Sequence, residues 1–313
     1  MNDYAIRSIG IELGERELSV DELARAQGET VPRIESMLAG MVVHATSRSR
    51  TELAQAAVTR CLTKVGLTIA EVDLVITCRS RTPTDKEPPL EHSLGLRDIA
   101  AMRVTGPCPV LFQSIWMARA WLRSEGARRA LVVYAETCEA EQRVLGPIHA
   151  SAPRDIFSDA AGAVLIEQGA GLALRGYGNV QTSAWWEYFE GTLASAGDEL
   201  QITRDSVEAS KLAVHRCLET SRFSLDEIDA FILPNEVDLL MRFIARHLRI
   251  PAGRLVRLPR APSHAWAVDP IHSLERLMRT HELPPAKRVV CLSRGAGIAA
   301  ALALEAVGVP GVD

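Results

Sequence analysis

Hydrophobic residues along the chain fall into two arrangements, short runs that are apolar throughout and longer stretches with helical spacing. The runs Leu-Val-Ile-Thr, Ala-Leu-Val-Val-Tyr-Ala and Phe-Ile-Leu contain almost no polar position. Such runs are typical of strands that helices cover on both faces of a sheet. Amphipathic stretches of helical length separate them. The alternation of the two arrangements predicts an α/β protein.

The pattern predicts a similar series of elements in each half of the chain. The N-terminal 15 residues are strand-like. In the first half we expect helices over 51–66 and 109–124 and strands over 74–78, 130–135 and 163–167. In the second half we expect helices over 205–221, 237–247 and 269–280 and strands over 230–233, 255–258, 288–292 and 298–304.

Two segments of the chain resemble each other at an offset of 156 residues. Residues 57–76 read AVTRCLTKVGLTIAEVDLVI and residues 213–232 read AVHRCLETSRFSLDEIDAFI. Two unrelated amphipathic units would not need the same arginine and cysteine in the same places, so the repeat favours an internal duplication. We therefore expect two similar α/β halves, 1–168 and 169–313, packed around a pseudo-two-fold axis.

Composition narrows the class of protein. The 313 residues are 47% hydrophobic and 24% charged with a net charge of −4, which indicates a globular chain and argues against nucleic acid as a partner. Six scattered cysteines without metal-binding spacing predict reduced thiols and no metal site. No signal-peptide pattern and no apolar run of about 18 residues is present, so we expect a cytoplasmic protein without a membrane span.

One cysteine stands out by its position. Cys108 lies between two prolines, directly before the helix expected over 109–124, with Pro109 at the helix start. A thiol at a helix N-terminus is favoured as thiolate, although most single cysteines are buried core residues. The offset of 156 residues places His264 at the equivalent position, also before a helical stretch. The repeat thus brings a candidate nucleophile and a candidate base toward one pocket, although a capping or surface role for His264 is equally open.

Several segments, in order along nearly the whole chain, resemble the thiolase superfamily and most closely its ketoacyl-ACP synthase III branch. The segments are PLEHSLGLRDIAAMRV (89–104), Cys108, SEGARRALVVYAE (124–136), DIFSDAAGAVLIE (155–167), EIDAFILPNEVD (227–238), RLPRAPSHA (257–265) and RGAGIAAALAL (294–304). The resemblance implies a thiolase-like fold with five αβαβα layers. It also implies that Cys108 is the residue that becomes acylated.

The resemblance also reveals departures at the site. Asn235 stands where the family has a histidine, and Ser263 stands where it has an asparagine, with His264 beside it. In the condensing enzymes that pair stabilises the enolate formed when malonyl-ACP loses CO₂. Pro-Asn-Glu-Val is similar to the Asn-Glu-Ala-Phe motif of thiolases, which pair asparagine with a histidine. Cys108, Asn235 and His264 are therefore the candidate catalytic residues, with Ser263 as a secondary candidate.

Further roles follow from the resemblance alone. The backbone N–H groups of Cys108 and of the terminal glycine turn, Gly295 and Gly297, would form the oxyanion hole. Arg242, Arg246 and Arg249 would bind CoA or an acyl carrier protein, unless they form a solvated basic helix face. Two more expectations rest on the residues themselves: Trp185 and Trp186 line an acyl or acceptor pocket or a dimer interface, and Cys291 is a core residue.

These observations favour an acyltransferase that uses an acyl thioester, of CoA or of a phosphopantetheinyl carrier protein, in secondary metabolism. A hydroxyl or amine acceptor needs only one general base, and His264 is the candidate. Decarboxylative condensation is expected to be weak. Two alternatives remain open, a catalytically impaired partner of a heterodimeric ketosynthase and a thiolase-like enzyme that joins carbon to carbon. We expect no cofactor besides the thioester substrate, and a homodimer or heterodimer formed through the strand 130–135.

Overall fold

The computed structural model describes most of the chain, namely residues 4–80, 90–96, 99–138, 144–145, 155–182, 196–236, 238–280, 287–295 and 297–308. The aromatic run at Trp185 and Trp186 lies outside the described residues. None of the helices in this described part is long and apolar enough to cross a membrane.

A nine-stranded sheet runs through the molecule. In spatial order its strands are β11 (Ala230–Ile232), β12 (Arg288–Gly295), β13 (Ile298–Val307), β10 (Gly171–Gln181), β1 (Tyr4–Leu13), β9 (Ala160–Gln168), β6 (Arg129–Glu136), β4 (Leu74–Arg79) and β5 (Ala100–Thr105). β1 pairs antiparallel with both β9 and β10. The four strands of the second half are therefore joined to the five of the first half at β1.

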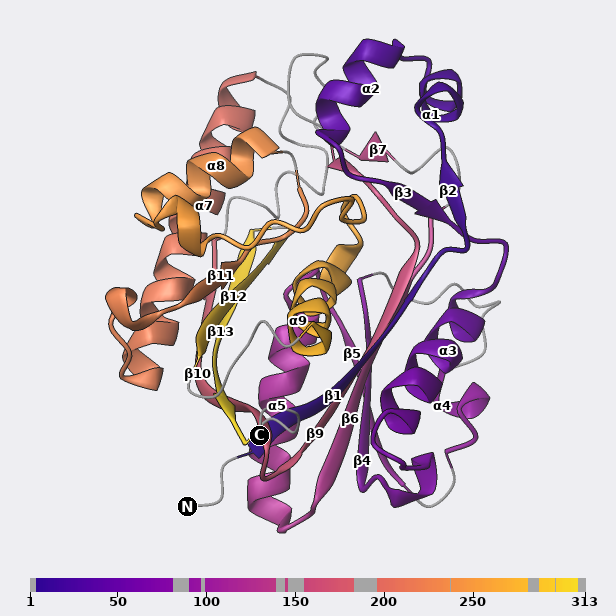
Figure 1. Ribbon diagram of the computed structural model, residues 1–313, viewed down its shortest axis with the longest axis vertical. Coiled ribbons are helices and arrows are strands. Elements are labelled where there is room, and N and C mark those ends of the chain that lie inside the picture. The colour runs from indigo at the N-terminus through magenta and orange to yellow at the C-terminus, as the bar shows by residue number, and fades with distance from the viewer. Residues whose placement is uncertain are drawn as a thin grey trace.

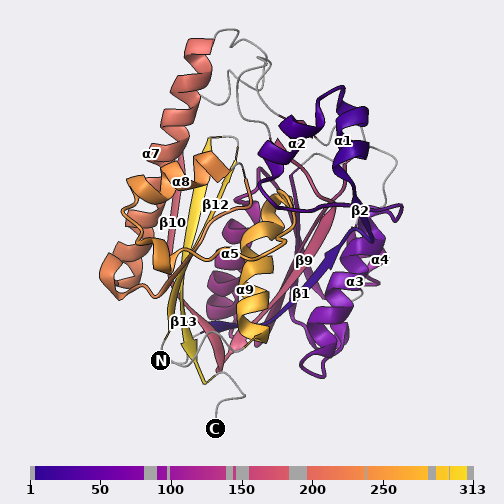
Figure 2. The ribbon, with the colours of Figure 1, turned by 45° about the horizontal axis from the view of Figure 1, so that its top comes forward.

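Helices cover the two parts of the sheet in five layers (Figures 1 and 2). α3 (Arg50–Thr63) and α4 (Leu90–Ser93) lie outside the first part, and α7 (Ala196–Ser221) and α8 (Asp238–His247) lie outside the second. Between the two parts lie α5 (Val110–Glu125) and α9 (Asp269–Arg279). The chain thus has the expected αβαβα arrangement, with two central helices that begin at the two candidate catalytic segments.

A small unit beside the layers was not expected from the hydrophobic pattern. It comprises β2 (Arg16–Leu18), α1 (Val20–Gln27), α2 (Val31–Leu38) and β3 (Val43–Ala45), and it packs through its own apolar cluster. β7 (Val144–Leu145) and β8 (Asp155–Ile156) form a separate two-stranded pair. Residues 39–42, which connect α2 to β3, reach the candidate site.

The internal repeat has a structural counterpart in each half. α3 lies so close to β1 that a Cβ atom at Gly10 would be 2.0 Å from the Ala57 carbonyl oxygen. α7 lies as close to β10, where a Cβ atom at Gly178 would be 1.9 Å from the Ala213 carbonyl oxygen. Only glycine permits such an approach of helix backbone to strand. Ala57 and Ala213 are matching positions of the repeat, so both halves use the same contact.

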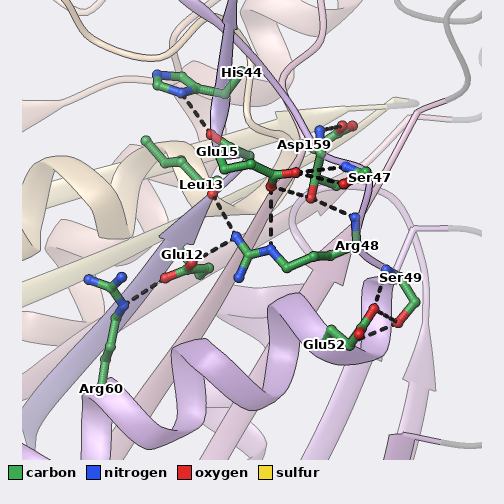
Figure 3. A network of polar contacts seen from close by, with 12 residues as sticks. Glu12, Leu13, Glu15, His44, Ser47, Arg48, Ser49, Glu52, Arg60 and Asp159 are labelled. Atoms are coloured by element: carbon green, nitrogen blue, oxygen red, sulfur yellow. Dashed lines mark hydrogen bonds and ion pairs between the residues drawn. The ribbon is translucent and has the colours of Figure 1, made fainter.

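The repeated arginines also contact matching strands. Arg60 on α3 binds Glu12 on β1 with an Nε–Oε2 distance of 2.6 Å. Glu12 also binds Arg48, which in turn contacts Glu15 (Figure 3). In the second half, Arg216 on α7 donates to the carbonyl oxygen of Asn179 on β10 at 2.8 Å. Each arginine therefore binds the strand that its own helix covers.

Two expectations about strands were wrong. Residues 255–258 form no strand, because only one isolated bridge links Leu255 to Phe231 and no further ladder follows. The strand expected at the dimer edge over 130–135 is β6, which lies between β4 and β9 and is buried. Its apolar sequence reflects burial inside the sheet. The strand at this edge of the sheet is β5.

Candidate active site

Cys108 lies in the turn that connects β5 to the central helix α5. The helix begins at Val110 with Pro109 as its N-cap residue, one position later than the sequence predicts. The turn is closed by the N–H of Val110, which donates to the Pro107 carbonyl oxygen at 2.8 Å. Cys108 is 8% exposed. The thiol therefore lies at the N-terminal end of a 16-residue helix, where the helix dipole favours negative charge.

The structure brings Cys108 and His264 together. The Sγ of Cys108 lies 3.8 Å from the Nε2 of His264, and the His264 ring is also buried. These two residues are the pair that the 156-residue offset connects. Hydrogen bonds of a nucleophile to its base are often this long before substrate binds. The arrangement can transfer the thiol proton to the imidazole.

A third group, Asp269, completes the arrangement and was not predicted from the sequence. Its Oδ2 contacts the Nδ1 of His264, and the residue is 0% exposed. Because a carboxylate only accepts hydrogen bonds, Nδ1 carries the proton and Nε2 faces Cys108. Asp269 also accepts from the backbone N–H of Ala265 at 2.6 Å and of Asn235 at 3.0 Å. Cys108, His264 and Asp269 thus form a connected nucleophile, base and orienting group.

The electrostatics of the pair favour a charged imidazolium. Burial lowers the pKa of His264, but the charge and hydrogen bond of Asp269, together with Cys108, hold that pKa well above its ordinary value of 6.5. Burial raises the pKa of the Asp269 carboxyl, while His264 and the two backbone donors act in the opposite direction. His264 can therefore hold the proton that Cys108 gives up.

The backbone of the His264 segment is fixed by the residues that precede β9. The N–H of Ser158 donates to the His264 carbonyl oxygen at 3.0 Å, and the Phe157 ring packs on the imidazole with centroids 4.8 Å apart. Ser263, the secondary candidate, binds the Ser158 hydroxyl at 2.8 Å. Its N–H donates to the carbonyl oxygen of Val42. The hydroxyl of Ser263 is thus part of the scaffold that supports the histidine.

Asn235 contacts the site through its backbone N–H, and its side-chain amide has an unused donor. Its N–H binds Asp269, and its side-chain Nδ2 is buried without a hydrogen-bond partner among the described residues. Asn235 lines a cavity of about 470 Å³, which is within the usual size of small-molecule sites. Met41, Met241 and Arg257 also line it. Asn235 thus has an unused buried donor beside this cavity, whose lining among the described residues includes neither Cys108 nor His264.

The terminal glycine turn approaches the nucleophile. A Cβ atom at Gly295 would lie 3.5 Å from the N, Cβ and Sγ atoms of Cys108. Gly297 lies further along the turn with a φ of +71° and accepts through its carbonyl oxygen from Thr182. Gly295 is thus the glycine that the structure brings against Cys108.

The remaining candidates lie elsewhere. Arg242, Arg246 and Arg249 are exposed on or just after α8, and Arg242 binds Asp238 at 2.6 Å. Cys291 is 1% exposed within β12, and burial raises the pKa of its thiol. Cys291 is therefore a core residue, as expected.

Comparison with known proteins relates the chain to ketoacyl-ACP synthase III. No family model matches the chain. The beta-ketoacyl-acyl-carrier-protein synthase III of Porphyra purpurea is 25% identical over 274 residues, which is 80% of this chain and 82% of that protein. The structure of 3-oxoacyl-acyl-carrier-protein synthase III from Aquifex aeolicus has a TM-score of 0.81 at 17% identity and covers 96% and 99% of the two chains.

The chain is thus similar to ketoacyl-ACP synthase III over most of its length, and it shares the fold of those proteins. The structure of ChlB3, an acyltransferase, matches this chain equally well, with a TM-score of 0.81 at 19% identity. The match covers 97% of this chain and 98% of that chain. The thiolase-like fold inferred from the sequence is thereby confirmed. At the positions where the resemblance implies a histidine and an asparagine the chain has Asn235 and Ser263, and Asp269 supports His264.

Proposed function

We propose that the protein is an acyltransferase that carries its acyl group on Cys108 and passes it to a hydroxyl or amine acceptor. The observation that carries the proposal is the connected set of Cys108, His264 and Asp269, in which the imidazole lies 3.8 Å from the thiol. Such a set activates a nucleophile and then serves as a general base toward an acceptor. The donor is an acyl thioester of CoA or of an acyl carrier protein.

The first step forms the acyl-enzyme. His264 Nε2 takes the proton of the Cys108 thiol, and the thiolate attacks the thioester carbonyl carbon. The oxyanion is stabilised by backbone N–H groups at Cys108 and at the Gly295 turn that lies against it. When the carbon–sulfur bond to the donor breaks, His264 returns the proton to the departing thiol. Asp269 stabilises the imidazolium throughout this step.

The second step releases the acyl group. An acceptor hydroxyl or amine attacks the Cys108 thioester, and His264 takes the acceptor proton. The bond to Sγ breaks and the thiolate is restored. One base suffices for this reaction because no carbanion has to form.

The same geometry disfavours decarboxylative condensation. The hydroxyl of Ser263 is bonded to Ser158, so it does not replace the asparagine amide that the condensing enzymes use. Loss of one donor to a developing oxyanion typically slows a reaction by about 10²–10³-fold. Asn235, whose N–H binds the same carboxylate as His264 and whose Nδ2 has no described partner, keeps a thiolase-like condensation as the second candidate. A non-catalytic partner role is less well supported, because the Cys108, His264 and Asp269 set is complete.

The proposal is tested by intact mass spectrometry of the purified protein after incubation with a panel of acyl-CoA and acyl-carrier thioesters. We expect one added acyl group, which peptide mapping assigns to Cys108, and none in the variant Cys108→Ala. The isolated acyl-enzyme is then mixed with hydroxyl and amine acceptors and with malonyl thioester. Loss of the acyl group to a hydroxyl or amine supports the proposal.

Three outcomes would contradict it. Acylation at another residue, or with none of the donors, favours a non-catalytic partner subunit. Efficient release of CO₂ from malonyl thioester identifies a condensing enzyme in which His264 has taken over the missing role. The variant Cys291→Ala is the matched control, since this thiol is buried in the core and should not affect acylation.

A further inference from the structure

A buried ion pair lies behind the candidate site and has no part in the chemistry described above. Arg294, near the end of β12, binds Glu236, which follows β11. The Nε of Arg294 donates to Oε1 at 3.1 Å and to Oε2 at 2.8 Å, and Nη2 lies 2.6 Å from Oε2. Nη1 contacts the Ser206 hydroxyl on α7. Arg294 is 8% exposed and Glu236 is 4% exposed.

Stability alone is a weak explanation for such a pair. Taking both charges out of water costs free energy that their attraction often does not recover, and apolar residues of similar volume serve stability as well or better. A guanidinium that meets a carboxylate through two nitrogens does, however, fix the relative position of two chain segments. The question is therefore which segments this pair connects.

One partner is continuous with the turn that faces the nucleophile. Arg294 is followed directly by Gly295, and a Cβ atom on Gly295 would lie 3.5 Å from the Sγ of Cys108. The position of the Arg294 backbone thus determines where the end of β12 meets Cys108. A shift of this strand end would change the surroundings of the thiol and of the proposed oxyanion hole.

The other partner is continuous with the segment that supports the base. Glu236 is preceded directly by Asn235, whose N–H donates to Asp269 at 3.0 Å. Asp269 in turn holds the Nδ1 of His264. One buried ion pair therefore joins the chain segment that touches the nucleophile to the chain segment that touches the orienting carboxylate.

We propose that the Glu236–Arg294 ion pair is a positioning pair that sets how the His264–Asp269 side of the site faces Cys108. The inference rests on the proposed function, since it assigns the pair to the same proton transfer between thiol and imidazole. Neither residue touches the reacting atoms. Their effect is on geometry, and a misplacement of about 1 Å in such a site slows the reaction by up to about 100-fold.

The test measures alkylation of Cys108 by iodoacetamide, followed by peptide mapping, which needs neither thioester nor acceptor. The variants are Arg294→Lys, Glu236→Gln and the apolar double variant E236L/R294M. At pH 7 we expect alkylation at least tenfold slower than in the wild type. At pH 10, where thiols ionise without a base, the rates should agree. Thermal unfolding by circular dichroism shows that each variant is folded at the temperature of the assay.

The double variant separates positioning from stability. It removes both buried charges, so its unfolding temperature should return toward that of the wild type while alkylation at pH 7 stays slow. Alkylation at the wild-type rate in the double variant, or in either folded single variant, would overturn the proposal. The controls Arg129→Lys and Glu167→Gln break a half-buried ion pair on β6 and β9, and they should leave alkylation unchanged.

The variant His264→Ala distinguishes this inference from the proposed function. If it slows alkylation at pH 7 and the pair variants do not, only the positioning role fails. If His264→Ala alkylates as fast as the wild type, the thiol does not depend on the imidazole. That result would reject the proposed mechanism, and the positioning role with it.

Discussion

Asp269 determines how the imidazole of His264 is used. The carboxylate accepts the hydrogen bond of Nδ1–H, so Nε2 faces Cys108. The same carboxylate raises the pKa of the ring against the effect of burial. The Asp269 side chain is held by the N–H groups of Ala265 and Asn235. A neutral amide in its place would keep the shape but could donate to Nδ1 and place the proton on the wrong nitrogen.

We therefore expect Asp269→Asn to slow acyl transfer by about 10³–10⁴-fold without unfolding the protein. The pH dependence should change as well. Transfer needs neutral His264, so the wild-type rate rises as pH passes the raised pKa, above 6.5. Without the carboxylate, burial lowers that pKa and the rise moves to lower pH. Single-turnover transfer rates between pH 5 and 9 measure both effects, with exposed Asp226→Asn as control. An unshifted profile would contradict this role.

The pKa of a second histidine, His272 on α9, is shifted in the opposite direction to that of His264. Burial lowers its pKa to about 4, and its Nδ1 is buried without a hydrogen-bond partner among the described residues. Because the ordinary value is 6.5, the unfolded chain binds this proton first as pH falls. As the pH falls from 6.5 to 4, His272 therefore lowers the free energy of unfolding. The neutral ring is the form that fits the fold.

Between pH 7.5 and pH 5 this single residue should reduce the free energy of unfolding by about 2 kcal/mol. The variant His272→Gln should lose correspondingly less stability over the same interval, because glutamine does not titrate. Urea unfolding at the two pH values gives the difference. The matched control is His215→Gln, at an exposed position of α7. Equal pH dependence in the wild type and in His272→Gln would show that the ring is protonated at little cost.

At the scale of elements, the two halves depend on the same helix-on-strand contact. α3 approaches β1 at Gly10, and α7 approaches β10 at Gly178, with no room for a side chain at either position. Adding one methyl group must move the helix away from its strand along the whole contact. Because each helix covers the apolar face of its half, such a movement opens the core.

We expect Gly10→Ala and Gly178→Ala to destabilise the protein by similar amounts, about 3 kcal/mol each. The similarity is the informative part, since it follows from the duplication. Gly253→Ala is the control, because nothing lies within 4 Å of a Cβ atom there. Thermal or urea unfolding measures all three. A much smaller effect at one glycine would indicate that its helix can shift, and that the two contacts are not equivalent.

The sequence predicted the larger elements because their apolar runs and helical spacing are set by burial on both faces. The Cys108–His264 contact followed from the 156-residue offset. Asp269 was missed because its contact depends on the tight turn Trp266–Val268, which folds the start of α9 back to the histidine. α1 was missed although Ser19 and Glu22 form a capping box that marks its start. Residues 255–258 have strand-like residues but no neighbouring strand long enough to pair with.

At the scale of the whole molecule, the exposed edge of the sheet bears on assembly. β5 pairs with β4 on one side, and its Ala100, Ala101 and Arg103 side chains are exposed. The other side of β5 is the edge of the nine-stranded sheet. An unprotected edge invites pairing with another strand. The dimer expected from the sequence should therefore form through β5, and this remains a prediction.

We expect light scattering to give a dimer at micromolar concentration and a monomer for Ala101→Lys, because lysine on an edge strand opposes pairing. Ala252→Lys adds the same charge at an exposed position away from the sheet and should leave the dimer intact. A wild-type protein that is monomeric at this concentration would show that the edge is protected in another way. A dimer that survives Ala101→Lys would place the interface elsewhere.

The position of β1 between β9 and β10 has a consequence for synthesis of the chain. Residues 4–13 leave the ribosome well before their partners, since residues 160–168 and 171–181 follow more than 140 residues later. At about 5–20 residues per second, the strand waits roughly 10–30 s before it can pair. During that time a largely apolar segment has no sheet to join. The nascent chain should therefore depend on chaperones to protect β1, and a ribosome that pauses before residue 181 should yield aggregation-prone protein.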